Sequence, residues 1–99
     1  MGARTGTAAR EITSYRDEIK KGIIKRNWAD LLVNLGRLQG FLKAIEDSLE
    51  EEDKKLIYPE IDRLINCAVR KDKVKCMVYY TNLDAALVSE LHIPPNFKL

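Results

Sequence analysis

Few side chains in this sequence combine the type and the spacing that catalysis or metal binding requires. The chain has one histidine, His92, and two cysteines, Cys67 and Cys76. A single histidine excludes a histidine-rich metal site and a relay of several histidines. The sequence also contains no glycine-rich phosphate loop, no nucleophile elbow and no helical zinc-protease motif. Most enzymes with well-marked sites are therefore excluded, whereas an enzyme without a recognisable motif is not. We expect no catalytic residue, metal ligand or cofactor.

The two cysteines lie on either side of a short polar connection at residues 70–73. Residues equidistant from the turn of a helical hairpin lie side by side, so we expect the two sulfurs to be neighbours. A disulfide is conceivable, whereas a metal site would need two further ligands. His92 lies about 24 Å beyond Cys76 along a helix, too far to bind the same ion. We favour buried free thiols, and cysteines in a chain without a signal peptide indicate a reducing, cytoplasmic setting.

Asp84 is an acidic residue on an apolar helix face, between Met77 and Leu91. Burial raises the pKa of a carboxyl group, which suits general acid–base chemistry. Buried charges are usually paired, so the alternative is a structural contact with Arg37, Arg63 or a tyrosine hydroxyl. No second acid or histidine accompanies Asp84 in the sequence, and we therefore expect a structural role.

Four amphipathic helices are expected to position these residues. The length of 99 residues suits one domain, the 45% of hydrophobic residues supplies one core, and no apolar run could span a membrane. Apolar residues at three- and four-residue steps predict helices over 8–25, 28–49 and 72–91. A further helix is expected to begin within 49–56 and to end near Val69. Short connections then predict an all-α, up-down-up-down bundle.

Local signals set the expected ends of these helices. Asn27 is predicted to cap the second helix, and either Ser48 or Asp53 to cap the third, with Pro59 in its first turn. Residues 1–7 are predicted to be a flexible leader, 8–93 the single helical domain and 94–99 a short tail. In that tail, Phe97 and Leu99 are candidates to fold back on the bundle. The sequence shows no internal repeat.

Two helices carry apolar surface that a monomeric bundle does not need. Opposite the leucines of the second helix lies a small-residue stripe formed by Ala29, Val33, Gly36, Gly40 and Ala44. Glycine inside a helix costs about 1 kcal/mol relative to alanine, so the stripe favours the close approach of another helix over a solvent face. The fourth helix is apolar over most of its circumference, which favours burial by a partner. The interface residues predicted on it are Met77, Val78, Asp84 and Val88.

The net charge of +2 conceals a segregation of charge along the chain. Residues 1–26 and 54–75 each carry seven basic and three acidic residues, whereas residues 27–53 carry two and seven. In the predicted bundle the two basic segments meet at one end, as an anion-facing patch of Lys20, Lys21, Lys25, Arg26, Arg70, Lys71, Lys73 and Lys75. We favour compensation of two helix dipoles as the explanation of these cations, and an anion-binding surface is the alternative.

These observations predict a small, non-enzymatic protein–protein interaction module or adaptor. The expected partner is a second copy of the chain or another helical protein, bound through the second and fourth helices. The alternative is a nucleic-acid accessory protein that binds phosphates through the basic patch. Nucleic acid is the less favoured partner, because nothing in the sequence resembles a helix-turn-helix.

Overall fold

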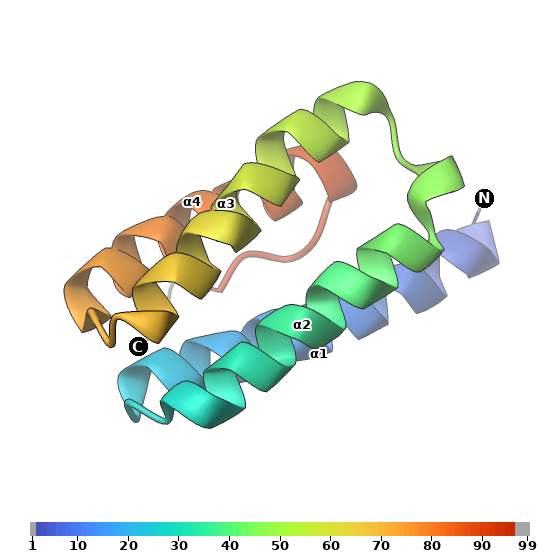
Figure 1. Cartoon of the computed structure of the whole chain (residues 1–99). Helices are drawn as coiled ribbons and strands as arrows, with labels where there is room; N and C mark the ends of the chain where they lie inside the picture. Colours follow the sequence, from blue (N-terminus) through green and yellow to red (C-terminus); the bar gives the residue numbers. More distant parts are fainter. Residues whose placement is uncertain (1, 97–99) are drawn as a thin grey trace.

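The computed structural model describes residues 2–96, with side chains from Ala8 onward. Its elements are α1 (Gly2–Ile24), α2 (Trp28–Ala44), the short 3₁₀ helix η1 (Glu46–Ser48), α3 (Glu51–Val69) and α4 (Lys73–Leu91), as Figure 1 shows. No strand occurs within the described part of the chain. The prediction of a small all-α bundle of four helices is confirmed. The predicted fold-back of Phe97 and Leu99 lies outside the described residues.

Several helix ends differ from their predicted positions. The first helix begins at Gly2, so residues 2–7 extend it. The second ends at Ala44, five residues early, because the chain turns through η1 at Glu46–Ser48. The third begins at Glu51, with Glu50 as the capping residue in place of Ser48 or Asp53. Pro59 therefore lies inside the helix and not in its first turn, where the missing N–H would cost less.

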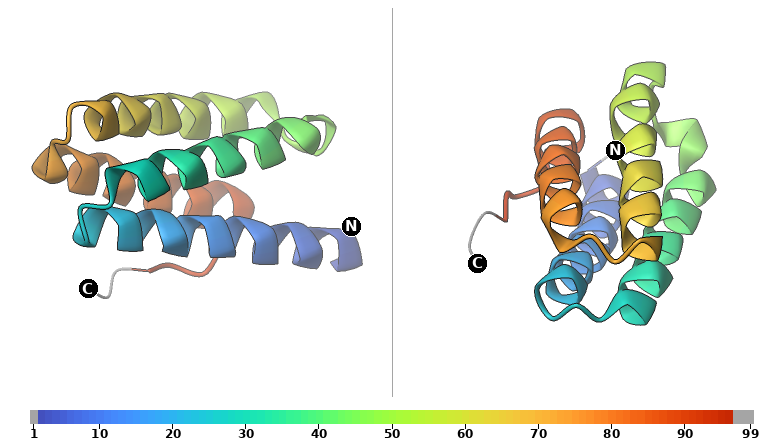
Figure 2. Two further views of the ribbon diagram at one scale, coloured as in Figure 1. Left: turned by 60° about the horizontal axis from the view of Figure 1, so that its bottom comes forward. Right: turned by 60° about the vertical axis from the view of Figure 1, so that its left-hand side comes forward.

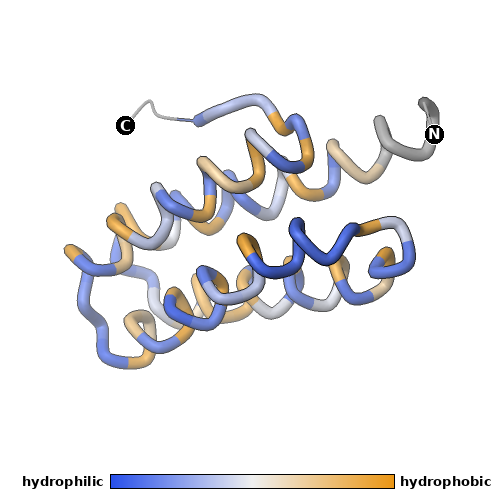
Figure 3. The backbone as a smooth tube through the Cα atoms, turned by 90° about the horizontal axis from the view of Figure 1, so that it is seen from above, coloured by the Kyte–Doolittle hydropathy of each residue, from blue (hydrophilic) through white to orange (hydrophobic). Residues whose placement is uncertain are grey.

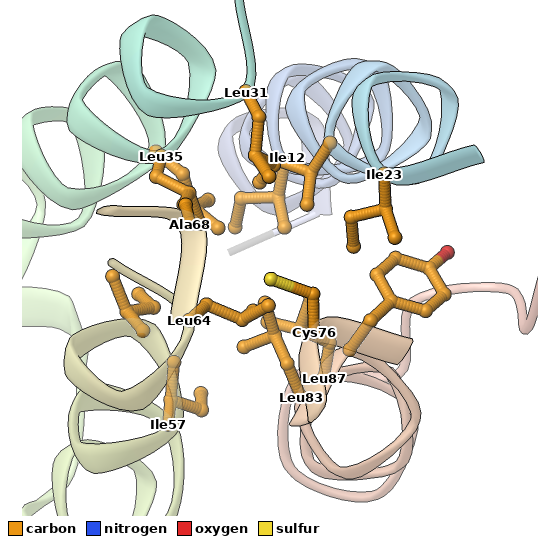
Figure 4. Packing of buried hydrophobic residues seen from close by; sticks show 14 of the residues in the cluster. Ile12, Ile23, Leu31, Leu35, Ile57, Leu64, Ala68, Cys76, Leu83 and Leu87 are labelled. Atoms are coloured by element: carbon orange, nitrogen blue, oxygen red, sulfur yellow. The ribbon is translucent and has the colours of Figure 1, made fainter. Parts of the chain in front are cut away.

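The four helices form a closed ring of neighbours. Helix α1 packs against α2 and α4, and α3 packs against the same two helices, whereas α1 lies diagonally opposite α3, and α2 diagonally opposite α4 (Figure 2). Hydrophobic and hydrophilic residues alternate along each helix (Figure 3), and the hydrophobic side chains meet in the interior of the bundle (Figure 4). Leu31, Leu35, Leu64 and Leu83 are among the fully buried residues. The outer faces of α2 and α4 therefore lie on opposite sides of the molecule.

The two helical hairpins, α1–α2 and α3–α4, repeat each other at a spacing of 45 residues. Buried positions of the first hairpin recur as buried positions of the second: Ile12, Ile19, Gly22, Ile23, Leu31, Leu38 and Leu42 correspond to Ile57, Leu64, Cys67, Ala68, Cys76, Leu83 and Leu87. Most exposed positions of the first hairpin are also exposed in the second. The sequence itself shows no repeat, because the repeat lies in burial and geometry and not in residue identity.

The connections between the paired helices also repeat. Asn27 N donates to Gly22 O and Arg26 N to Ile23 O, and at the same spacing Asp72 N donates to Cys67 O and Lys71 N to Ala68 O. Arg26 and Lys71 both adopt the left-handed conformation, with φ of 55° and 58°. Asn27 and Asp72 then cap α2 and α4 through their side chains, which confirms the predicted cap at Asn27.

Candidate functional site

Asp84 lies inside the bundle and forms an ion pair across it. Arg16 of α1 donates to Asp84 Oδ1 at 3.0 Å, and both side chains are almost wholly buried. The partner is therefore Arg16 and not Arg37 or Arg63, which are both exposed. Desolvation of the two charges offsets much of the attraction in a buried ion pair, but removal of one partner leaves an uncompensated buried charge. Because Asp84 is buried inside the bundle, another protein cannot contact it. The prediction that Asp84 is an interface residue is therefore wrong.

Residues 93–96 after α4 form a C-terminal strap that returns along α1 (Figure 2). The strap completes the polar cluster around Asp84. Arg16 also donates to Pro94 O, and Asn96 N donates to Asp84 Oδ2 at 3.3 Å. Lys20 Nζ donates to the backbone and side-chain oxygens of Asn96, at 3.1 and 3.0 Å. Lys20 is thus buried by the strap, so it does not belong to the predicted anion-facing patch.

Sequence reasoning missed Arg16 as the partner of Asp84, although a signal was present. Arg16 stands on the apolar face of α1, four residues after Ile12 and three before Ile19. A cation on one apolar face and an acid on another are complementary, and pairing them would have predicted this contact. Tyr80 lies beside the pair, where burial raises the pKa of its hydroxyl. That hydroxyl has no hydrogen-bond partner among the described side chains.

The two cysteines are free, buried and adjacent in the core. Burial, and then a hydrogen bond with Cys67, raises the pKa of the Cys76 thiol to about 12. Cys67 Sγ in turn donates to Arg63 O at 2.9 Å. Because a thiol, unlike a thiolate, is a poor nucleophile and a poor metal ligand, this arrangement does not favour chemistry at the pair.

The small-residue stripe lies on the outer face of α2, exposed along its whole length. All five of its residues are exposed, with Val33 at 50%. Nothing lies within 4 Å of the point where a Cβ on Gly36 or on Gly40 would stand. Gly22 of α1 differs, because a Cβ there would meet Leu31 Cβ of α2 at 3.1 Å. Close packing inside the bundle therefore explains Gly22 and leaves Gly36 and Gly40 unexplained.

The outer face of α4 is the equivalent surface of the second hairpin. Val74, Val78 and Ala85 occupy the positions of Ala29, Val33 and Gly40, and the two valines are 76% and 53% exposed. Met77 and Val88, also predicted at the interface, are half-buried. The two surfaces that the sequence singles out are thus related by the internal repeat, but the fold does not bring them together.

The connections of the two hairpins meet at one end of the bundle, which we call the basic end: Lys25, Arg26, Arg70, Lys71, Lys73 and Lys75. Lys73 Nζ donates to Ile24 O at 3.3 Å and so joins the two connections. An open depression there is lined by Arg26, Arg70, Lys71 and Lys73, together with Trp28. Lys21 lies outside the depression and pairs with Glu18. The structure therefore brings six of the eight predicted cations to this end.

The opposite end of the bundle is acidic around an apolar pocket of about 310 Å³. Ile12, Leu91 and Ile93 contribute apolar surface to it, and Glu50 and Asp53 contribute carboxylates. The segregation of charge along the sequence thus becomes a difference between the two ends of the molecule.

No protein-family model, curated protein or solved structure matches this chain. Within residues 2–96, no helix is long and apolar enough to cross a membrane. The same residues hold no group of three or more histidine, cysteine or acidic side chains placed to bind a metal ion. The surfaces of the fold are therefore the basis for any functional proposal.

Proposed function

We propose that this chain is a small protein–protein interaction module that self-associates through the outer face of α2. Its activity is the occupancy of a partner and not catalytic turnover. Because the outer faces of α2 and α4 point in opposite directions, one symmetric dimer cannot use both of them. A contact of α2 with α4 would instead join copies head to tail into a ring or an open chain. The proposed dimer therefore pairs α2 with α2 of a second copy and leaves α4 outside the contact.

Gly36 and Gly40 carry this proposal. Each costs about 1 kcal/mol of helix stability relative to alanine, and nothing in the bundle occupies the space beside them. The internal repeat shows that the fold does not need glycine at these positions, since the equivalent residues of α4 are Thr81 and Ala85. Exposed glycines one turn apart allow a second helix backbone to approach closely. A contact with another molecule offsets the cost that the isolated bundle leaves unexplained.

The test is the absolute mass by light scattering after size exclusion, at two protein concentrations and with a reductant present. We expect twice the 11.4 kDa of one chain for the native protein, and the mass of a single chain for Gly36→Leu and for Gly40→Leu. Both substitutions favour the helix, because leucine is a better helix former than glycine. Loss of the dimer therefore cannot result from unfolding of α2, which circular dichroism would verify.

The matched control is the same substitution on the equivalent face of α4. Thr81→Leu and Ala85→Leu add comparable bulk to exposed positions of the second hairpin and are expected to leave the dimer intact. A monomeric native protein at both concentrations would refute self-association. Dimers that persist in both glycine variants would refute the choice of α2 as the contact surface.

A further inference from the structure

The basic end carries six cations that take part in no ion pair within residues 8–96. The ion pairs described there involve Arg16, Lys21, Lys54 and Arg63, none of which belongs to the basic end. The two connecting segments, 25–30 and 70–75, contain only Asp30 and Asp72 as acids. Asp72 caps α4 by accepting from Lys75 N at 3.1 Å. The positive charge at this end is therefore left to attract an anion from outside.

The backbone at the basic end places long cationic side chains where stability alone would favour glycine. Arg26 and Lys71 occupy the left-handed position that ends α1 and α3, at φ of 55° and 58°. Glycine is the usual residue there because a Cβ strains the left-handed conformation. Both connections carry a basic residue at this position, within the same hydrogen-bond pattern. His92 has the same conformation at the end of α4, with φ of 57°, so a left-handed residue other than glycine is not confined to the basic end. The two connections of the basic end share a cation at this position.

Trp28 adds an aromatic surface to the cations. It is the only tryptophan of the chain, is half-buried, and lines the same depression as Arg26, Arg70 and Lys73. An aromatic ring among cations is the arrangement on which single-stranded nucleic acids bind, with phosphates on the cations and a base stacked on the ring. Trp28 follows Lys25 and Arg26 in the sequence, and the fold brings it beside Arg70 and Lys73.

The shape of this end favours a single strand over a duplex. The depression lies across two connections, between the first residues of α2 and α4, and no helix projects from it to enter a major groove. No side chain here could contact the base edges inside a duplex, whereas an unpaired base can stack on the ring of Trp28. A lipid surface would be attracted by the same charge and is the alternative that the test must separate.

We propose that the basic end binds single-stranded nucleic acid, with backbone phosphates on Arg26, Arg70, Lys71 and Lys73 and one base against Trp28. Recognition is of the phosphate backbone and a base face, so it tolerates different sequences. The site is distinct from the outer face of α2, and this inference does not rest on the proposed dimer.

The test is a titration with a fluorescein-labelled oligothymidylate of about 12 nucleotides, within the range of single-strand site sizes. Fluorescence anisotropy reports binding, and the emission of the single tryptophan, recorded with an unlabelled strand, reports contact at Trp28. We expect saturable binding that weakens with salt, together with quenching of Trp28. A duplex of the same length and vesicles containing phosphatidylserine are expected to bind at least about tenfold more weakly.

The decisive variant is Arg26→Gly/Lys71→Gly, because it removes two cations while relieving strain in the backbone. We expect at least tenfold weaker binding, a salt slope smaller by about 1.4 for two lost phosphate contacts, and a melting temperature equal to or above that of the native protein. The matched control, Lys43→Gln/Lys55→Gln, removes two exposed cations elsewhere and is expected to retain native affinity.

Any of the following results would overturn the proposal. The first is absence of binding to the oligonucleotide at low salt. The second is native affinity in the double glycine variant, or binding without any change in the emission of Trp28. The third is vesicle binding as tight as that of the oligonucleotide, which would assign the basic end to a lipid surface.

Discussion

The ion pair between Arg16 and Asp84 lends itself to a quantitative prediction, because the internal repeat supplies its own reference. The residues equivalent to Arg16 and Asp84 are Ile61 of α3 and Gln39 of α2. Helices α2 and α3 therefore pack against each other without an ion pair at the position where α1 and α4 have one. Arg16→Ile leaves Asp84 buried, with Asn96 N at 3.3 Å as its remaining described hydrogen-bond donor.

Breaking a buried ion pair from one side costs about 3–5 kcal/mol, a large part of the roughly 5–15 kcal/mol that stabilises a domain. We expect Arg16→Ile to lower the free energy of unfolding by about 3–5 kcal/mol, measured by urea unfolding followed by circular dichroism. Arg16→Ile/Asp84→Gln copies the α2–α3 contact and is expected to regain more than half of the loss, because no uncompensated charge remains. Both variants should have the native dependence on urea concentration, since the same surface is exposed on unfolding.

Two results would refute this reasoning. If Arg16→Ile lost less than about 1 kcal/mol, the carboxylate of Asp84 would have to be solvated in the folded state, contrary to its burial. If the double variant were as unstable as the single one, the cost would come from lost packing or from detachment of the strap. Asn96→Ala removes the side-chain contacts of Asn96 with Lys20 and Asp17. Its effect on the free energy of unfolding measures the contribution of the strap separately.

Three further predictions concern the interior of the bundle. Gly22→Ala should destabilise the fold in thermal unfolding despite the better helix propensity of alanine, because its Cβ would stand 3.1 Å from Leu31 Cβ. Pro59→Ala should stabilise it by up to about 3 kcal/mol, since proline inside α3 removes a backbone hydrogen bond. Cys76, with its pKa raised from 9.0 to about 12, stays a protonated thiol as the pH rises while the unfolded chain ionises. Its contribution to stability is therefore complete below pH 9 and falls between pH 9 and 12, a loss that Cys76→Val should abolish in urea titrations.

The repeat of two hairpins connects the two proposed surfaces. Residue types differ at most equivalent positions. Two of these differences lie on the proposed surfaces: the glycines of α2 stand where α4 has Thr81 and Ala85, and Trp28 stands where α4 has Lys73. A third is the buried pair of Arg16 and Asp84, to which the strap is attached.

Local sequence determined the helices of this protein and the character of their faces. The spacing of apolar residues, the cap at Asn27 and the polar connection before α4 all act within a few residues, and they were therefore readable in order along the chain. The start of α3 was less readable, because Ser48, Glu50 and Asp53 compete as caps within six residues. The basic segments were likewise visible, because charge at a helix end is a local property.

Only the tertiary structure decided which of these faces meet. Arg16 and Asp84 are 68 residues apart, and nothing near either residue in the sequence specifies the other. The burial of Lys20 required the strap to return along α1, and the exposure of Gly36 required the other three helices to pack on the opposite side of α2. The repeat itself was hidden for the same reason. Core packing conserves volume and position and not residue identity, so Gly22 against Leu31 and Cys67 against Cys76 fill equivalent contacts with different side chains.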